Sequence, residues 1–519
     1  MQNKKLAVVK DTASKEKRDE VIGKNFPEFL TIYLPENLDL NKLIEENPPT
    51  GFTAFDKDKI AYILHLINYL PTIKKDFDYY EYDGYIPINK QKLQSKIYDY
   101  RMYLDYLIHC GVIFEDEYYI KGEKSKGICF YPEYTYTKIR RSKITRKTLI
   151  KAILKGSSKH NLIAQTETEV QTENKTGNQD EFHYLTKWWK SNGLTIDYEA
   201  AKNFLDEKLL KDREQFIQKF GTDDYETVKK QFREKGRKKA KEKVKYPLEQ
   251  YNSALMTMDR LYRKDYFIRV DETAGRLHSL LSQLPKDLRQ FVSFESKKLV
   301  SIDLRNSQPL LATVLLNTDL FKSNPILINT ISKFNPIYQQ TNSSTMIVDL
   351  IKKNQDKPDV LNYKRIVAKG EYYEEFGTIL QTKGFIPDDC IDSRKFAKEA
   401  TYASFFAPNT YLGFTEPMKH FKKAFPNVYH IFSRIKFQKK GYKGRFHKAL
   451  AITLQAFEAD LFLHKICKRI YETNPDIPIF TIHDSVVTTI EYTEIVEQIL
   501  KEEVFKAIGV NPILNIEKW

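Results

Sequence analysis

Cysteine is scarce and unpatterned in this chain. The four cysteines, at positions 110, 129, 390 and 467, form no Cys-x-x-Cys pair. Disulfide frameworks and zinc knuckles both need closely spaced thiols, so the sequence argues against either. We expect free thiols in a reducing cytosol.

Long apolar runs are also missing, and we expect no secretory leader. The longest apolar run, Pro309 to Leu316, is far shorter than the roughly 20 residues of a membrane-spanning helix. The first residues, Met1 to Val9, acquire charge too early for a secretory signal. No internal repeat points to a solenoid. We therefore expect a cytoplasmic protein with no membrane partner.

Positive charge and aromatic side chains are abundant. The 519 residues include 84 Lys and Arg against 69 Asp and Glu, a formal net charge of +15. This balance fits a polyanionic partner, with nucleic acid ahead of membrane, although solubility alone is an equal explanation. The 33 Tyr and 32 Phe residues suit core packing first and base stacking second. A chain of this length has room for roughly two to four domains.

Two helices are expected near the start of the chain. Asn89 is a candidate N-cap for a helix over residues 90–97. A second helix, over residues 99–110, is expected to stop at Gly111. Its expected core residues lie at helical spacing: Tyr103, Leu107 and Ile108.

A hairpin with a basic turn follows these helices. Its strand pieces are expected over residues 112–114, 118–120 and 128–131. The order helix, helix, hairpin makes residues 1–155 similar to a winged helix, a module that often docks a helix in a DNA groove. A structural or protein-binding module is an equal alternative, because only fold-level analogy favours DNA.

The middle of the chain is polar and then basic. Residues 156–182 lack apolar periodicity and are expected to form a polar linker. Residues 183–246 are expected to form a basic helical connector or thumb-like region, with ten Lys and Arg between positions 229 and 245. Phosphate contact is one interpretation of these cations, and a solvated helix face is the other.

The first segment with chemical interest is Leu299 to Leu304. Its apolar residues alternate with polar ones, which predicts a half-buried strand with Asp303 on the polar face. Asn306 to Pro309 is expected to break the strand, with a helix from Leu310. A carboxylate at such a rim is accessible to a ligand, although many surface strands end in aspartate.

The second such segment, residues 477–490, is expected to be a β-hairpin with His483 and Asp484 at its tip. Tight tips need positive φ and usually use Gly or Asn, but His and Asp tolerate that region better than most residues. The tip is either a strained turn that serves a function or an ordinary surface turn. If Asp303 and Asp484 meet at a sheet edge, they can hold two divalent ions for phosphoryl transfer.

A helix is expected over residues 392–408, ended by Pro408. Residues at intervals of four form one stripe on it: Arg394, Lys398, Tyr402 and Phe406. The cations can grip a triphosphate and a ring can stack on a base. The alternative is an amphipathic helix with solvent-facing cations and core aromatics.

Taken in chain order, these motifs resemble the catalytic core of family A DNA polymerases and of the related single-subunit phage and mitochondrial RNA polymerases. The similar segments are Thr273–Ser279, Ser301–Asp303, the 394–406 helix, Leu454–Asp460 and Ile482–Ser485. The resemblance covers residues 247–519. It implies an α+β fold: a right-hand core with an antiparallel palm sheet and helical fingers, preceded by the winged-helix-like module.

The resemblance also implies which residues bind metal and triphosphate. Asp303 and Asp484 would be the catalytic carboxylates that bind two Mg²⁺ ions, with Mn²⁺ as a substitute. Magnesium needs only one or two carboxylates besides substrate phosphates, so this pair is sufficient. Arg394 and Lys398 would hold the incoming nucleoside triphosphate.

Further roles are carried over in the same way. Tyr402 would sense the sugar 3′ position, and Phe406 would stack near the nascent base pair. Arg276 would touch the minor groove at the primer end, and Gln455 would contact template or primer. His483 would help to place the primer terminus.

Departures from the family pattern leave the choice of sugar open. Gln308 stands five residues after Asp303, where family A DNA polymerases carry a glutamate that blocks the ribose 2′-hydroxyl. Ser485 is typical of the RNA polymerase branch, whereas residues 274–277 and Tyr402 are more like the DNA branch.

We therefore expect a template-directed DNA polymerase that adds deoxynucleotides to the primer of a DNA primer-template, without a proofreading exonuclease, in replication of a phage or mobile element. An RNA polymerase or primase-like enzyme is the first alternative. A catalytically inactive DNA-binding replication protein is the second, and a two-metal nuclease, which generally has more carboxylates, is weaker. The sequence leaves protein partners unknown, and it assigns no role to residues 317–365.

Overall fold

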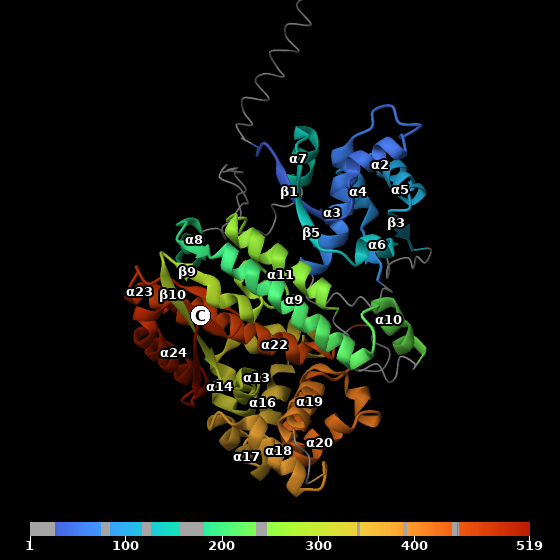
Figure 1. Ribbon diagram of the computed structural model, residues 1–519. Helices are drawn as coiled ribbons and strands as arrows, with labels where there is room; N and C mark the ends of the chain where they lie inside the picture. Colours follow the sequence, from blue (N-terminus) through green and yellow to red (C-terminus); the bar gives the residue numbers. More distant parts are fainter. Residues whose placement is uncertain are drawn as a thin grey trace, which may run out of the picture. The chain divides into compact units, whose positions relative to one another are not determined.

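A computed structural model describes most of the chain (Figure 1). The described residues are 26–73, 84–116, 126–155, 181–234, 246–339, 343–387, 392–438, 444 and 446–519. The chain divides into two compact units, one made of residues 1–175 and 197–265, the other of residues 176–196 and 266–519. The expected connector, residues 183–246, therefore contributes to both units.

The first unit combines a small helix-and-strand module with three further helices. Its elements are β1 (Leu30–Pro35), α2 (Leu40–Glu46), α3 (Lys57–Ile73), β2 (Ile86–Pro87), α4 (Lys90–Gln94), α5 (Tyr100–His109), β3 (Ile113–Glu115), β4 (Gly127–Phe130), α6 (Pro132–Thr135), β5 (Ile139–Ile144), α7 (Lys147–Leu154), α9 (Tyr198–Phe220), α10 (Tyr225–Glu234) and α11 (Pro247–Tyr262). β1 pairs with β5, and β2, β4 and β3 form a second antiparallel sheet in that order.

The two helices expected near the start are present. The Asn89 side chain accepts a hydrogen bond from the Lys92 N–H and caps α4, which is shorter than expected. Helix α5 buries Tyr103 and Leu107 completely, whereas Ile108 is partly buried. Gly111 follows this helix with a φ of +67°, as its stop position requires. The expected strand piece over residues 118–120 lies outside the described residues.

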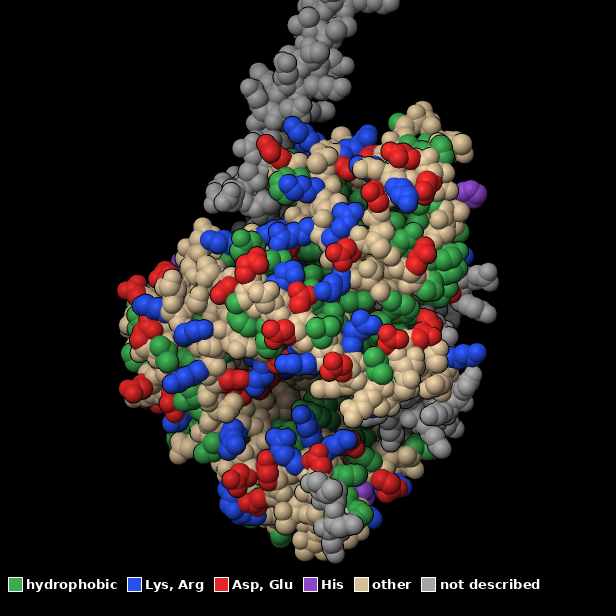
Figure 2. Space-filling model, in the orientation of Figure 1, with side chains coloured by type: hydrophobic (Ala, Val, Ile, Leu, Met, Phe, Trp, Pro, Cys, Tyr) green, Lys and Arg blue, Asp and Glu red, His purple; other side chains and the backbone are tan. Residues whose placement is uncertain are grey.

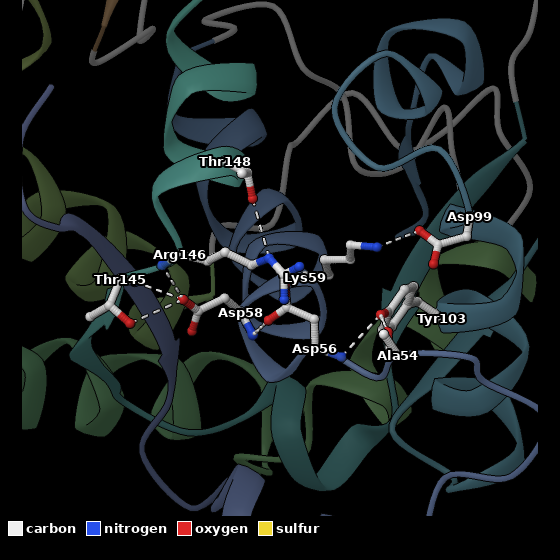
Figure 3. A network of polar contacts seen from close by, with 9 residues as sticks. All are labelled: Ala54, Asp56, Asp58, Lys59, Asp99, Tyr103, Thr145, Arg146 and Thr148. Atoms are coloured by element: carbon white, nitrogen blue, oxygen red, sulfur yellow. Dashed lines mark hydrogen bonds and ion pairs between the residues drawn. The ribbon is translucent and has the colours of Figure 1, made fainter. Parts of the chain in front are cut away.

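Polar contacts fasten the end of β5 to the first turn of α3 (Figure 3). Arg146 Nε lies 3.0 Å from the Oδ2 of buried Asp56. The backbone N–H groups of Thr145 and Arg146 each donate to Asp58 Oδ2 at 2.7 Å. The Tyr103 hydroxyl accepts a hydrogen bond from the Asp56 N–H. Through these contacts α3, α5 and the start of α7 form one framework.

A buried carboxylate joins the β1–β5 pair to α11. Asp259, which is 1% exposed, accepts a hydrogen bond of 2.6 Å from the Tyr33 hydroxyl. Arg141 and Arg263 form ion pairs with it at 2.6 and 2.9 Å. These partners compensate the desolvation of the charge.

The expected linker lies outside the described residues up to residue 180, and so does the basic stretch over residues 235–245.

The second unit combines one antiparallel sheet with a helical part. Its elements are α8 (His183–Lys190), β6 (Leu194–Ile196), β7 (Ile268–Val270), β8 (Leu277–Ser279), α12 (Leu280–Gln283), β9 (Val292–Phe294), β10 (Lys297–Leu304), α13 (Ser307–Leu311), α14 (Thr318–Ser323), α15 (Pro325–Phe334), α16 (Ser343–Asn354), α17 (Pro358–Ala368), α18 (Tyr372–Thr382), α19 (Ser393–Phe406), α20 (Glu416–Ala424), α21 (Pro426–Ile435), α22 (Lys448–Ala459), α23 (Lys468–Thr473), β11 (Phe480–Ile482), β12 (Ser485–Thr489), α24 (Thr493–Ile508) and β13 (Leu514–Lys518).

The sheet is antiparallel throughout, with strand order β11-β12-β10-β9-β6 and β13 also paired with β10. The expectation of an α+β protein with an antiparallel sheet is confirmed. The strand expected over residues 299–304 is β10, and strand β6, in the stretch expected to be helical, joins the same sheet.

The helix after β10 begins earlier than expected. Asn306, with a φ of +52°, makes the turn, and α13 starts at Ser307 instead of Leu310. Pro309 does not prevent this, because a proline in the first turn of a helix removes no intrahelical hydrogen bond. Residues 317–365, without an expected role, contain α14, α15, α16 and most of α17.

The helical part surrounds α19. This helix packs between α18 and α20 and also contacts α22. Figure 1 shows α17, α18, α19 and α20 gathered in the orange part of the unit. Helix α22 continues into a π-helical turn, Asp460–Cys467, before α23. Among the residues that the structure describes, no helix has the length and apolarity needed to cross a bilayer.

Candidate active site

The pairing of β10 with β12 brings Asp303 and Asp484 together. Asp303 lies opposite Ser485, the residue after Asp484. The backbone N–H of Leu304 points to the carbonyl oxygen of Asp484 at 3.4 Å. Two carboxylates far apart in the sequence thus occupy neighbouring positions at one end of the sheet.

The hairpin expected over residues 477–490 is present with the expected tip. β11 and β12 pair with Ile482 opposite Ser485, which leaves only His483 and Asp484 in the turn. His483 has a φ of +54°. A non-glycine residue in this left-handed region is uncommon and strained, and it is held here by two buried strands.

Negative charge accumulates around Asp303. Burial raises the pKa of the Asp303 carboxyl, and the charges of Asp484 and Glu517 raise it further. Asn515 Nδ2 donates to Asp303 Oδ1 at 3.2 Å, and this hydrogen bond and the charge of Lys286 act in the opposite direction. Burial is the largest of these effects, so the raised pKa of Asp303 reports mainly the desolvation of its carboxyl group, and the neighbouring carboxylates add to it.

Carboxylate oxygens are the ligands that Mg²⁺ prefers, and it needs only one or two of them besides substrate oxygens. Asp303 and Asp484 therefore fit the ion and would hold it. Within the described ranges, no group of three or more His, Cys, Asp or Glu side chains has the arrangement of a metal site.

A second cluster forms around Glu458, which is 2% exposed on α22. Arg276 Nη2, from the β7–β8 hairpin, lies 2.8 Å from Glu458 Oε1, and Gln308 Nε2 donates to Oε2 at 2.6 Å. Burial raises the pKa of Glu458 to about 7, against the opposing effect of Arg276. The charge of Asp484 also raises it, so the cluster is electrostatically coupled to the hairpin tip.

The β7–β8 hairpin presents Arg276 through a compact turn. Asp271 accepts hydrogen bonds from the N–H groups of Thr273, Ala274 and Arg276, and its Oδ2 lies 3.0 Å from His278 Nε2. These contacts lower the pKa of Asp271 to about 2 despite its partial burial. The turn that carries Arg276 is therefore rigidly tied to one carboxylate.

The stripe expected on the 392–408 helix lies on α19, and its residues are outside the core. Arg394 and Lys398 are exposed, Tyr402 is 38% exposed and Phe406 is partly buried. Phe405 fills the core instead. The solvent-facing cations of the amphipathic alternative are therefore present, whereas its core aromatic residues are not: Tyr402 is exposed and Phe406 is only partly buried.

The members of the stripe contact one another and α18. Arg394 Nε forms an ion pair of 2.7 Å with Glu374, and Lys398 Nζ lies 5.7 Å from the centre of the Tyr402 ring. The rings of Tyr402 and Phe406 lie 5.5 Å apart. Helix α19 packs against α22, which carries Glu458. The stripe and the paired aspartates lie in the same unit.

Lys436 holds the end of α19 in place. The residue is 2% exposed, and its ammonium group donates to the carbonyl oxygens of Ser404 and Ala407 at 2.5 and 3.0 Å. These carbonyl groups belong to the last turn of the helix, where no further helical N–H group can reach them. Burial lowers the pKa of Lys436 to about 7.

Lys and Arg side chains are interspersed with Asp and Glu on the face drawn in Figure 2. Gln308 is carried by α13, and Glu458 and the half-buried Gln455 by α22.

Sequence reasoning missed the residues whose importance depends on their partners. Glu458 stands within the 454–460 motif without an assigned role, although a glutamate three residues after Gln455 in an apolar helix is a usable signal. Asn515 and Glu517 approach Asp303 only because β13 pairs with β10. Lys436 has no local signal, because a lysine in an apolar helix end normally extends into solvent.

Comparisons with known proteins do not show a family for this chain. No family model matches the chain, and no curated protein matches it. Among solved structures, the POL domain of Pol1 from M. smegmatis in complex with DNA primer-template and dNTP matches over 65% of this chain and 68% of its own. The identity is 14% and the TM-score is 0.37. A likeness at this level carries no argument, so the function has to be inferred from the residues themselves.

Proposed function

We propose that the second unit is a nucleotidyltransferase that extends the 3′-hydroxyl of a DNA primer with deoxynucleotides selected by a template. The observation that carries this proposal is the adjacency of Asp303 and Asp484 across the β10–β12 pair. Two carboxylates from distant chain segments at one end of a sheet suit a site for divalent cations.

In the proposed reaction, the primer hydroxyl attacks the α-phosphorus of a nucleoside triphosphate. The hydroxyl proton passes to solvent as a new P–O bond forms to the primer. The bond between the α-phosphorus and the oxygen that bridges to the β-phosphate breaks, and pyrophosphate leaves with the electron pair. Two Mg²⁺ ions at Asp303 and Asp484 would supply stabilisation of the attacking and the leaving oxygen. Mn²⁺ has similar ligand preferences and is expected to substitute.

The stripe on α19 would bind the nucleotide. Arg394 and Lys398 are exposed cations that can neutralise the triphosphate, with Arg394 exchanging its ion pair with Glu374 for phosphate oxygens. Tyr402 and Phe406 offer neighbouring ring faces for the sugar and the base. Binding in this way supplies positioning, which accounts for much of the rate in phosphoryl transfer.

Primer and template would lie against the other predicted residues. His483, at the strained tip beside Asp484, would orient the primer terminus. Gln455 and Arg276 would contact the duplex near its end. These roles follow the resemblance to family A polymerases, and the proposal includes no proofreading exonuclease.

The N-terminal module is proposed to bind DNA as a winged helix. The order α3, β2, α4, α5, β3, β4 with sheet order β2-β4-β3 supports this interpretation. The exposed face of α5 carries only Arg101 and His109 as basic residues, and Arg101 is paired with Asp105 and Glu115. Charge alone therefore gives the DNA role limited support.

Primer extension tests the catalytic proposal. Full-length protein is given a labelled primer on a template with dNTPs or rNTPs and Mg²⁺, beside Asp303→Ala and Asp484→Ala. We expect incorporation of dNTPs that depends on the template and falls at least about a thousandfold in both variants, because each removes a carboxylate from the reacting centre. Asp349→Ala, on the exposed surface of α16, is the matched control.

The outcomes separate the rival functions. Incorporation of rNTPs alone would favour an RNA polymerase or primase-like enzyme. Degradation of the primer would indicate a nuclease. DNA binding without incorporation would indicate a DNA-binding replication protein, and retained synthesis in either aspartate variant would refute the proposed site.

A further inference from the structure

One segment of the first unit carries positive charge without any acidic residue. Residues 138–155, which include β5 and α7, contain eight Lys and Arg and no Asp or Glu. Three of these cations pair with carboxylates of other elements: Lys138 with Asp206, Arg141 with Asp259, and Arg146 with Asp56. The other five are exposed and form no ion pair with any residue that the structure describes: Arg140, Lys143, Lys147, Lys151 and Lys155. Their charge is therefore available to an external polyanion.

Strand β5 places two of its cations on one face of the β1–β5 pair. Arg141 and Lys143 are two positions apart, so their side chains point to the same side, about 7 Å from each other along the strand. They lie opposite Tyr33 and Thr31 of β1. Asp259, which accepts the hydrogen bond from the Tyr33 hydroxyl, also pairs with Arg141 and fixes its position.

Aromatic rings continue the line of these two cations at both ends. The Lys143 ammonium lies 4.1 Å from the centre of the Phe29 ring, and the Arg141 guanidinium lies 5.1 Å from the centre of the Tyr198 ring. The rings of Tyr198 and Tyr262 lie 4.7 Å apart. All five residues belong to the first unit, and we call them the ring–cation row. Their order along the row is ring, cation, cation, ring, ring.

The ring–cation row is accessible to a ligand. Phe29 and Tyr262, at its two ends, are 41% and 51% exposed, and Lys143 is exposed as well. A single exposed ring on a protein surface needs no explanation. Rings and cations joined in one line, however, offer a ligand flat apolar faces and positive charge at the same time.

The cations of α7 extend the positive surface beside the Phe29 end of the row. Lys147, Lys151 and Lys155 follow one another at intervals of four, so they share one side of the helix. The Lys151 ammonium lies 5.3 Å from the centre of the Phe26 ring, three residues before Phe29. A ligand that stacks on Phe29 would therefore have further cations near it.

A single-stranded polynucleotide has the chemistry that this surface fits. Its phosphates carry the negative charge that exposed Lys and Arg side chains attract. Its bases are unpaired, so their faces can stack on aromatic rings. A duplex offers phosphates and groove edges but keeps its base faces stacked on one another, and it would leave the rings without a partner.

We propose that the ring–cation row binds a single strand of nucleic acid, with bases stacked on Phe29, Tyr198 and Tyr262 and phosphates held by Lys143 and the cations of α7. The function proposed above assigns no ligand to this face, so the inference does not depend on synthesis in the second unit. It also differs from the docking of a winged helix in a duplex groove, because the row needs unpaired bases.

Fluorescence anisotropy on the full-length protein separates stacking from charge. The labelled ligands are oligo(dT) of about 20 nucleotides, longer than common site sizes, and an abasic strand with the same number of phosphates. EDTA is present, so that no divalent ion links the strand to the paired aspartates. We expect wild type to bind oligo(dT) at least about tenfold more tightly than the abasic strand, because each stacked base contributes a factor of roughly five or more.

Variants at the row test the two kinds of contact separately. Phe29→Leu and Tyr262→Leu remove the end rings but keep apolar side chains, and each should weaken oligo(dT) binding about fivefold without affecting the abasic strand. Tyr98→Leu, at an 86% exposed ring of the same unit, is the matched control and should bind like wild type. Lys143→Gln should weaken both strands by a similar factor and reduce the slope of log affinity against log salt by about 0.7, with Lys42→Gln on α2 as its control.

Equal affinity of wild type for oligo(dT) and the abasic strand would overturn the inference, because charge alone would then explain binding. Unchanged oligo(dT) affinity in either ring variant would overturn it as well, even in a protein that extends primers. Ring-dependent binding by a protein that extends no primer would sustain the inference and refute the polymerase proposal. Tighter binding of oligo(U) than of oligo(dT), with the same losses in the ring variants, would sustain the inference and identify the strand as RNA.

Discussion

Replacing Asp303 by asparagine should make the second unit more stable while it removes activity. The carboxylate lies on a strand position next to Asp484, and its pKa is raised by burial and by the charges of Asp484 and Glu517. Charges about 5 Å apart, the spacing of neighbouring strand positions, repel by about 1–3 kcal/mol at effective dielectric constants between ~80 and ~20. Because Asp303 is partly exposed, we take the lower end, about 1 kcal/mol.

The asparagine should cause little compensating loss. Its Oδ1 can still accept the hydrogen bond that Asn515 donates to Asp303. The folded-state pKa of Asp303 is raised, so the wild-type stability falls as pH rises through that pKa. The advantage of Asp303→Asn should therefore be absent at pH values below about 4 and complete at neutral pH.

Tryptophan fluorescence is a suitable assay, because all three tryptophans, Trp188, Trp189 and Trp519, lie in the second unit. Urea unfolding is followed for wild type, Asp303→Asn and the exposed control Asp349→Asn, each with and without Mg²⁺. At tenfold excess over its dissociation constant, Mg²⁺ should stabilise wild type by about 1.4 kcal/mol and the Asp303 variant by much less. A destabilised variant, or equal stabilisation of all proteins by Mg²⁺, would refute the reasoning.

Three further predictions concern other parts of the unit. Lys398→Ala should raise the KM for nucleotides about tenfold in steady-state kinetics, while the KM for primer-template stays constant. An unchanged KM for nucleotides would contradict the assignment of Lys398 to the triphosphate. Lys436→Met should remove a pH dependence of the free energy of unfolding. Because the pKa of Lys436 is lowered in the folded state, wild-type stability rises with pH between about 7 and 10.5, by up to about 1.4 kcal/mol per pH unit. Urea titrations at several pH values should show this rise in wild type only. His483→Gly should change the free energy of unfolding by less than about 1 kcal/mol, because glycine relieves the positive φ, yet it should slow incorporation; unchanged incorporation would make the tip an ordinary turn.

Several local features of the fold follow from short segments of sequence. The alternation in residues 299–304 predicts β10, and the apolar residues around His483 and Asp484 predict the β11–β12 hairpin. Asn89 predicts the start of α4 through its capping side chain. In each case the determining interactions lie within one or two turns or between adjacent strands, so they can be inferred from spacing.

Other features required the full structure. The start of α13 at Ser307 depends on the left-handed backbone of Asn306, and Pro309, three residues after Asn306, misleadingly suggests a later start. Residues 183–265 are divided between the two units, because β6 pairs with β9 in the sheet of the second unit, whereas residues 197–265 belong to the first. The burial of Lys436 depends on the last turn of α19, some thirty residues away.

The sequence by itself determined the types of side chain and the elements that carry them: Asp303 on a strand, Asp484 in a tight tip, and a helix with two cations followed by two rings. Tertiary structure alone decided that Asp303 meets Asp484 and that Glu458 holds both Arg276 and Gln308. The physical reason is that a buried charge is stabilised by partners from any part of the chain, whereas periodicity describes only its neighbours in sequence.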